Sequence, residues 1–353
     1  MSVPGLANPI PLPARRVLRV ALATALALAI AYVMNRPLPY MVPLFTFMIC
    51  AAPGPALQAK SFVGLLLLVL VTCGAGLLLT PVLGEYPAVG LALIALGLYL
   101  ANYIVANKGQ NMAATLLTVG LTMITAAGTA SFELALAVVG ALLLAIVVAV
   151  VCQHIVHAIF PDDGISPEPP VVEPPNSDEL NWRALRATLI VFPPYLVALI
   201  NPMMYMPLIL KSAAIGQQDS VANARMLGRE TVVSTFLAGC LAILFWLGLK
   251  VNPSLWMFFL WMLLFGLYIS AKLYGVSKTR YPPSFWLNVG VTLLILVGPA
   301  VADSANGNDV YVAFAVRFAL FVGVALYAWA AMSLLDFLRR RAGGQTRIMV
   351  VEN

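Results

Sequence analysis

Long, almost uncharged hydrophobic runs follow one another along this chain, and they restrict its fold more than any other feature. Between Lys60 and Glu85, for example, the sequence carries no charged residue. A helix of roughly 20 such residues matches the hydrocarbon core of a bilayer, which is about 30 Å thick. The alternating ten-residue segments of an outer-membrane barrel do not occur. Because 62% of the residues are hydrophobic and only 10% are charged, we predict an all-α polytopic membrane protein.

Polar residues, glycines and prolines divide the hydrophobic runs into about twelve expected transmembrane helices. The expected spans are 15–34, 38–54, 61–80, 88–106, 112–128, 132–158, 183–200, 203–217, 229–249, 254–273, 284–302 and 309–338. A proline-rich, acidic segment separates the sixth span from the seventh and is expected to be an extended linker. The predicted organisation is a first membrane repeat at 1–159, a cytoplasmic linker at 160–182, a second membrane repeat at 183–341 and a cytoplasmic tail at 342–353.

Lysines and arginines are distributed unevenly between the two ends of these spans. If the N-terminus is cytoplasmic, 16 of the 20 positive residues fall on the cytoplasmic side. They are Arg15, Arg16, Arg19, Lys60, Lys108, Arg183, Arg186, Arg225, Arg229, Lys272, Lys278, Arg280, Arg339, Arg340, Arg341 and Arg347. This excess predicts a bacterial inner-membrane protein with both termini in the cytoplasm. The same distribution explains the net charge of +6 as a consequence of membrane orientation. We therefore expect no nucleic-acid partner.

The two halves of the chain resemble each other at matching positions. The matches are RVLR at 16–19 with RALR at 183–186, PLPYMVPL at 37–44 with NPMMYMPL at 201–208, QAK at 58–60 with NAR at 223–225, GLYL at 97–100 with GLYI at 266–269, and VGLT at 119–122 with VGVT at 289–292. The offset stays nearly constant, from 207 − 43 = 164 to 290 − 120 = 170. Six spans return the chain to its starting side, so we predict two parallel six-helix repeats.

Each predicted repeat opens with Arg-x-x-Arg before an alanine-rich span, continues with a short span containing proline, and has a basic residue at the start of the third span. This design resembles the fusaric-acid-resistance and aromatic-acid-exporter superfamily. The compact length and the stretch HIVHAIFP at 154–161 are similar to a branch of it, domain of unknown function 2955. The resemblance implies an inner-membrane efflux component that works with a periplasmic membrane-fusion adaptor and an outer-membrane channel.

Two cations fall inside predicted spans instead of at their ends. Lys211, in YMPLILKSAAIG, lies about nine residues into the eighth span, or roughly 13 Å deep. Arg317 lies about eight residues into the last span. No Asp or Glu is expected at this depth, so a bound organic anion would neutralise the two cations. The alternatives are that carbonyl groups satisfy Lys211 or that this lysine is left neutral, and that Arg317 reaches outward to Asp303 or Asp309.

Short proline-containing spans are the best sequence indicator of a transporter site, and the second and eighth spans are of this kind; the tyrosine and asparagine candidates below lie in other spans, except for Tyr205. Pro43 and Pro207 stand at matching positions in these spans. Tyr205, Tyr99 and Tyr268 are candidates for apolar walls of a substrate site or for ordinary packing. Asn102 and Asn288 are candidates for an inward-facing entrance or for hydrogen bonds between helices.

Proton coupling commonly uses a mid-membrane carboxylate, and none is expected here. The remaining candidates are Lys211, His154 and His157, with hydrogen bonding at the membrane interface as the alternative for the histidines.

The sequence therefore favours a secondary exporter of small organic anions or aromatic compounds, working by alternating access. Beyond the substrate, the expected partners are the adaptor, the channel and membrane lipids; homo-oligomerisation stays open. Neither a catalytic motif nor a metal-ligand pattern occurs, so we expect neither an enzyme nor a cofactor. The alternatives are a non-transporting scaffold that docks a periplasmic adaptor, and a membrane enzyme or lipid-handling protein.

Overall fold

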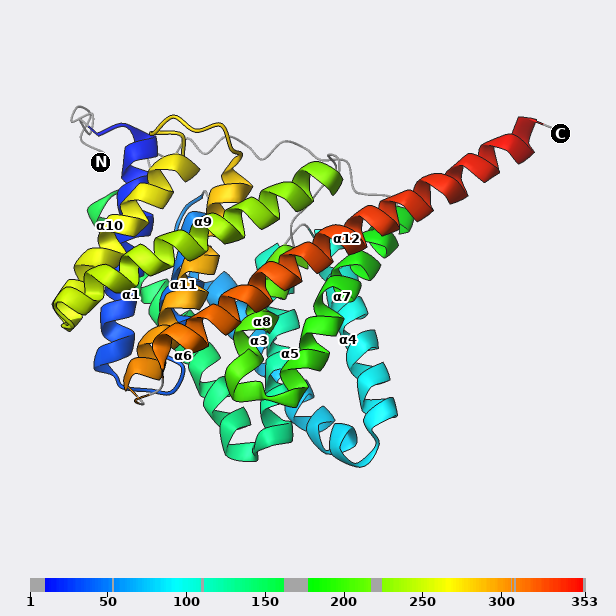
Figure 1. Ribbon diagram of the computed structural model, residues 1–353, viewed down its shortest axis with the longest axis horizontal. Coiled ribbons are helices and arrows are strands. Elements are labelled where there is room, and N and C mark those ends of the chain that lie inside the picture. The colour runs from blue at the N-terminus through cyan, green and yellow to red at the C-terminus, as the bar shows by residue number, and fades with distance from the viewer. Residues whose placement is uncertain are drawn as a thin grey trace.

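The computed structural model describes residues 10–52, 54–108, 111–161, 177–216, 224–305, 307 and 309–351, and every regular element in these ranges is an α-helix. The helices, shown in Figure 1, are α1 (Leu12–Val33), α2 (Met41–Ala51), α3 (Ala59–Glu85), α4 (Pro87–Lys108), α5 (Asn111–Ala130), α6 (Phe132–Ile159), α7 (Ser177–Ile200), α8 (Pro202–Gly216), α9 (Ala224–Val251), α10 (Leu255–Leu273), α11 (Pro283–Ala305) and α12 (Val310–Val351). α1 begins and α12 ends near the upper edge of this view.

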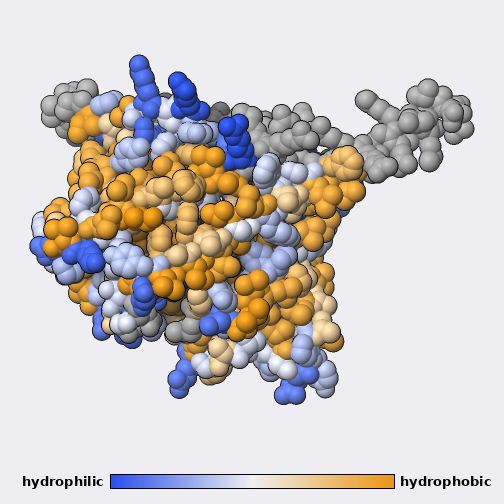
Figure 2. Space-filling view, viewed as in Figure 1, coloured by the Kyte–Doolittle hydropathy of each residue, from blue (hydrophilic) through white to orange (hydrophobic). Residues whose placement is uncertain are grey.

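The helices have the length and composition of membrane spans. Within the described ranges, nine are long and apolar enough to cross a bilayer, and α2, α5 and α8 contribute shorter apolar segments. Figure 2 shows broad hydrophobic surfaces across the visible face, with hydrophilic residues gathered toward its edges. The described part of the chain is therefore all-helical, and the prediction of a multi-pass helical membrane protein is confirmed.

Two helices reach into the segments that were expected to be the linker and the tail. α7 begins at Ser177, inside the segment expected to be an extended linker, whose residues 162–176 lie outside the described ranges. Its first turn carries Asp178 and Glu179, which suit the positive end of the helix dipole. Glu179 also pairs with Arg183 one turn later, at 2.9 Å. α12 continues to Val351 through most of the expected tail, and its end projects beyond the bundle in Figure 1.

α11 is the most enclosed of the long helices. In its most apolar stretch 83% of the residues are buried, against 22% in α3 and α4. α11 packs against α2, α8, α9, α10 and α12, so neighbours surround it on all sides. A polar side chain on this helix therefore has to find its partner within the protein.

Two glycines allow the chain around α2 to approach α11 closely. The Phe47 ring lies against Gly290, and Tyr40 lies against Gly298. A Cβ atom at either glycine would overlap the aromatic side chain that faces it. These two positions therefore require glycine for steric reasons, although both lie in a regular helix, where glycine itself is unfavourable.

We predict that Gly290→Ala lowers the free energy of unfolding by roughly 1–3 kcal/mol, because the buried Phe47 ring must move. The matched control is Gly74→Ala on α3, where an added Cβ would meet nothing within 4 Å. That control should be neutral or slightly stabilising, since alanine favours the helix. Thermal unfolding of the detergent-solubilised protein measures both effects. Equal effects of the two substitutions would contradict close packing at Gly290.

Candidate functional site

Lys211 is the centre of the candidate site, and its side chain is completely buried. It lies in α8 one turn after Pro207, which is also buried. Its ammonium group donates hydrogen bonds to Asn288 Oδ1 at 2.8 Å and to Thr292 Oγ1 at 2.5 Å. Both acceptors belong to α11, where a spacing of four residues places them on the same side of the helix. The ammonium group therefore joins α8 to α11.

The hydrogen bonds continue from α11 to α9. Asn288 Nδ2 donates to Ser234 Oγ at 2.5 Å, and the Ser234 hydroxyl donates to the Thr231 carbonyl at 3.0 Å. The Thr292 hydroxyl donates to the Asn288 carbonyl at 2.6 Å, which leaves its oxygen free to accept from Lys211. We call these five residues the Lys211 network. All five are buried, so the network is a polar cluster shared by three helices inside an apolar bundle.

The Lys211 network holds a cation with neutral oxygens. Within the described ranges, no carboxylate lies within salt-bridge distance of Lys211. The ammonium has three N–H donors, and the described side chains accept from two of them. A buried positive charge without a negative partner is costly, and an anion that bound beside it would reduce this cost. The geometry therefore suits the binding of an anionic group.

Arg317 differs from Lys211 because it has an acidic partner. Its Nη1 bonds to Asp303 Oδ2, and its Nη2 donates to Asp303 Oδ1 at 3.3 Å. Both side chains are buried, with exposed fractions of 7% and 9%. The expectation that Arg317 lacks a carboxylate partner is therefore wrong. Arg317 is instead paired with Asp303, as the alternative interpretation expected. Asp303 lies in the last turn of α11, from which it faces Arg317 on α12.

The predicted tyrosines make contacts of their own. The Tyr99 hydroxyl donates to Asn181 Oδ1 at 2.7 Å in an exposed position. Tyr268 is 45% exposed and packs edge-on against Trp286. The Lys272 ammonium lies 5.4 Å from the centres of both rings, an arrangement typical of an interfacial anchor. Tyr205 is partly buried and lies in α8 itself. These contacts fit packing and anchoring.

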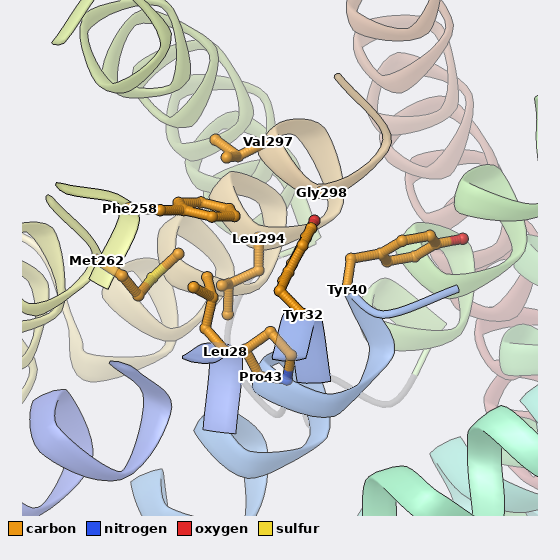
Figure 3. Close-up of a pocket in the computed structure, with 9 residues that line it drawn as sticks. All are labelled: Leu28, Tyr32, Tyr40, Pro43, Phe258, Met262, Leu294, Val297 and Gly298. Atoms are coloured by element: carbon orange, nitrogen blue, oxygen red, sulfur yellow. The ribbon is translucent and has the colours of Figure 1, made fainter. Parts of the chain in front are cut away.

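Pro43 lines a small apolar pocket between α1, α2, α10 and α11 (Figure 3). The other lining residues are Leu28, Tyr32, Tyr40, Phe258, Met262, Leu294, Val297 and Gly298. On α11, Leu294 and Val297 lie roughly 120–180° around the axis from Asn288 and Thr292, at 100° per residue. The pocket and the Lys211 network are therefore on different sides of α11, and the pocket does not adjoin the ammonium group.

The remaining candidates hydrogen-bond within their own helices. Asn102 Nδ2 donates to the Leu98 carbonyl at 2.8 Å. Nδ1 of His154 and of His157 each lies 2.8 Å from the carbonyl oxygen four residues earlier. None of these bonds reaches the Lys211 network. In the described part of the chain, no three His, Cys, Asp or Glu side chains are grouped to hold a metal ion.

Of the predicted site residues, the hydrogen bonds join Lys211 only to Asn288. Thr292, Ser234 and Thr231 were missed by the sequence analysis. A signal existed for Thr292, because it follows Asn288 by four residues within an expected span and therefore shares its side of the helix. Ser234 and Thr231 carry no such signal, since small hydroxyl residues are common in membrane helices and commonly bond their own backbone.

The fold and the site thus define a helical membrane protein with a buried cation in its second half. The family described as "Protein of unknown function (DUF2955)" has a model that matches residues 16–156. This match extends from α1 almost to the end of α6, and the Lys211 network lies outside it. The chain is thus similar over its first half to the family expected from the sequence. No curated protein and no solved structure matches the chain.

Stability measurements can distinguish a functional lysine from a structural one. Lys211→Met should leave the free energy of unfolding unchanged or raise it, because a neutral side chain of similar length avoids burying a charge. Asn288→Leu should lower it by roughly 1–3 kcal/mol, since it removes an acceptor from a buried cation. Thermal unfolding in detergent measures both. If Lys211→Met proves as destabilising as Asn288→Leu, the lysine serves mainly to hold the helices together.

Proposed function

We propose that the protein is a secondary exporter of small organic anions, chiefly aromatic carboxylates, and that it works by alternating access. The observation that carries this proposal is the buried Lys211 ammonium, to which the described side chains offer only the neutral oxygens of Asn288 and Thr292. A carboxylate that enters beside this group supplies a negative charge and accepts a charge-assisted hydrogen bond. The surrounding apolar side chains favour a cargo whose remaining part is hydrophobic.

Two parallel six-helix repeats, α1–α6 and α7–α12, form the two bodies that move in this proposal. The helix contacts support it, because pairs recur when each helix is replaced by the helix six positions away in the other half. α1 packs on α10 as α7 packs on α4; α3 packs on α5 as α9 packs on α11; and α2 packs on α6 as α8 packs on α12. Between the halves, α5 meets α8 and α11 meets α2. α8, which carries Lys211, therefore borders the other half.

Lys211 has no counterpart in the first half. The matching position, 211 − 164 = 47, is Phe47, which packs against Gly290 of α11. The proposal therefore gives each chain one Lys211 anchor, on a helix that borders the other half.

The setting of this exporter is the inner membrane, with both termini in the cytoplasm, and the distribution of positive residues supports this orientation. Membership of the fusaric-acid-resistance and aromatic-acid-exporter superfamily, with an adaptor and an outer-membrane channel as partners, is part of the same proposal. An anion that leaves a cell with a negative interior gains about 2.3 kcal/mol per charge for each 100 mV. The membrane potential alone can therefore drive export without an intramembrane acid.

Transport by the purified protein in lipid vesicles tests the proposal. Radiolabelled benzoate, phenylacetate and cinnamate should exchange across the vesicle membrane, whereas benzylamine should not. Lys211→Met should slow benzoate exchange by roughly 10- to 100-fold, because a hydrogen bond to a charged group contributes about 1.5–3 kcal/mol. The matched control is Lys250→Met, which removes an exposed lysine that bonds to Tyr311.

The outcomes separate the parts of the proposal. If none of the three carboxylates moves faster than in protein-free vesicles, the exporter function is contradicted. If Lys211→Met exchanges benzoate as fast as the Lys250→Met control does, transport stands but the role of Lys211 as anion anchor does not. If benzylamine moves as readily as benzoate, the site does not select for negative charge.

A further inference from the structure

One side of α11 carries polar side chains near its start and in its last turn, with a freed backbone carbonyl between them, and we call this set the row. Asn288, Thr292, Pro299 and Asp303 all lie within about 60° of one another around the helix axis, at 100° per residue. Pro299 has no N–H, so the Ile295 carbonyl on the same side lacks its usual helical partner. From Thr292 to Asp303 the rise is 11 residues (303 − 292), or about 16 Å. The row therefore leads from the Lys211 network toward the last turn of α11.

A second cation, Arg317, stands at the far end of this row. Its two terminal nitrogens bond to Asp303, while its Nε has no hydrogen-bond partner in the described ranges. Arg317 also lies within electrostatic range of Tyr40, whose hydroxyl points away from the apolar pocket in Figure 3. Three separate segments thus meet here: the connection before α2, the end of α11 and the first part of α12.

Arg317, like Lys211, has no charged counterpart in the first half, since 317 − 170 = 147 is Val147. Both cations belong to the second half, and both bond to the same side of α11. Their settings differ in one respect: neutral oxygens hold Lys211, whereas a carboxylate of the protein holds Arg317. A guanidinium group presents paired N–H donors that match a carboxylate, whether it comes from a side chain or from a ligand.

We propose that Arg317 is a second carboxylate-binding site, and that Asp303 occupies it when no cargo is present. An organic carboxylate leaving Lys211 moves along the polar side of α11 and displaces Asp303 from Arg317 before it is released. The exchange replaces one ion pair with an equivalent one, so the buried guanidinium is never left without an anion. Asp303 lies two residues before the end of α11, at Ala305. This proposal rests on the proposed function and adds its exit step.

Chemical labelling tests the site without relying on transport. Cys240 is the exposed cysteine and the other three are buried, so Cys240→Ser provides the background. Ile295→Cys then places a thiol in a fully buried position between the two ends of the row. The full chain in lipid nanodiscs is treated with the anionic reagent 2-sulfonatoethyl methanethiosulfonate. Adding Asp303→Asn should increase the labelling rate at least about tenfold, because the closing ion pair is lost.

Binding is read from protection by benzoate. In the Asp303→Asn protein, benzoate should occupy Arg317 and slow the labelling of Ile295→Cys, whereas benzylamine should not. The protection should disappear when Arg317→Met is added. Glu179→Gln is the matched control, because it breaks a partly exposed ion pair with Arg183 at the start of α7 and should leave the labelling rate unchanged. The exchanged pair, Asp303→Arg with Arg317→Asp, should restore slow labelling. That result would also show that the fold tolerates substitutions at these two positions.

Two results would overturn the second site: unchanged labelling in the Asp303→Asn protein, or no protection by benzoate there. Vesicle transport then distinguishes this failure from failure of the exporter function. If Lys211→Met slows benzoate exchange but Arg317→Met and Asp303→Asn exchange it at the wild-type rate, the anchor stands and the exit step is wrong. If the wild-type protein moves no carboxylate, the exporter function fails, and the labelling results alone decide whether Arg317 binds one.

Discussion

The cost of burying the Lys211 ammonium among neutral oxygens is the constraint that the packing of α8, α9 and α11 has to meet. Desolvating this cation is costly, so α11 must bring Asn288 and Thr292 to it, and α9 must in turn satisfy Asn288 through Ser234. The hydrogen bonds that meet this requirement link three helices. Hydrophobic burial between helices contributes little in a membrane, because lipid tails are as apolar as leucine. A polar network of this kind therefore helps to specify which helices pack together.

α11 meets different requirements on its different sides. Toward the chain around α2 it offers Gly290 and Gly298, against which Phe47 and Tyr40 pack. Toward α8, α9 and α12 it offers amide, hydroxyl and carboxylate groups to Lys211, Ser234 and Arg317. α11 therefore makes close steric contacts on one side and polar contacts on the other. α11 consequently joins the close packing against the chain around α2 to both buried cations.

Much of the fold could be predicted from the sequence because hydrophobic runs report helix position directly. The expected spans 132–158 and 254–273 agree with α6 and α10 to within a residue or so. The site was harder to predict. Lys211 was recognisable because a charge in an apolar run is rare, and Asn288 was a weak candidate for hydrogen bonding between helices. Tyr99 and Tyr268 were candidates because they occupy matching positions in the two halves. Yet Tyr99 bonds to Asn181 and Tyr268 packs against Trp286, and neither residue joins the Lys211 network. Position in a repeat does not say which way a side chain faces.

By itself the sequence determined that the chain is helical and crosses a membrane many times, since a bilayer leaves apolar runs of this length few alternatives. It also determined that two cations lie within the spans. Only the tertiary structure decided that these cations differ. Asp303 and Arg317 are 14 residues apart on successive helices, so their pairing depends on how α11 and α12 face each other. Lys211 and Asn288 are 77 residues apart, and only packing brings α8 against α11. Charge in an apolar run is a local property, whereas the presence of a partner depends on helix packing.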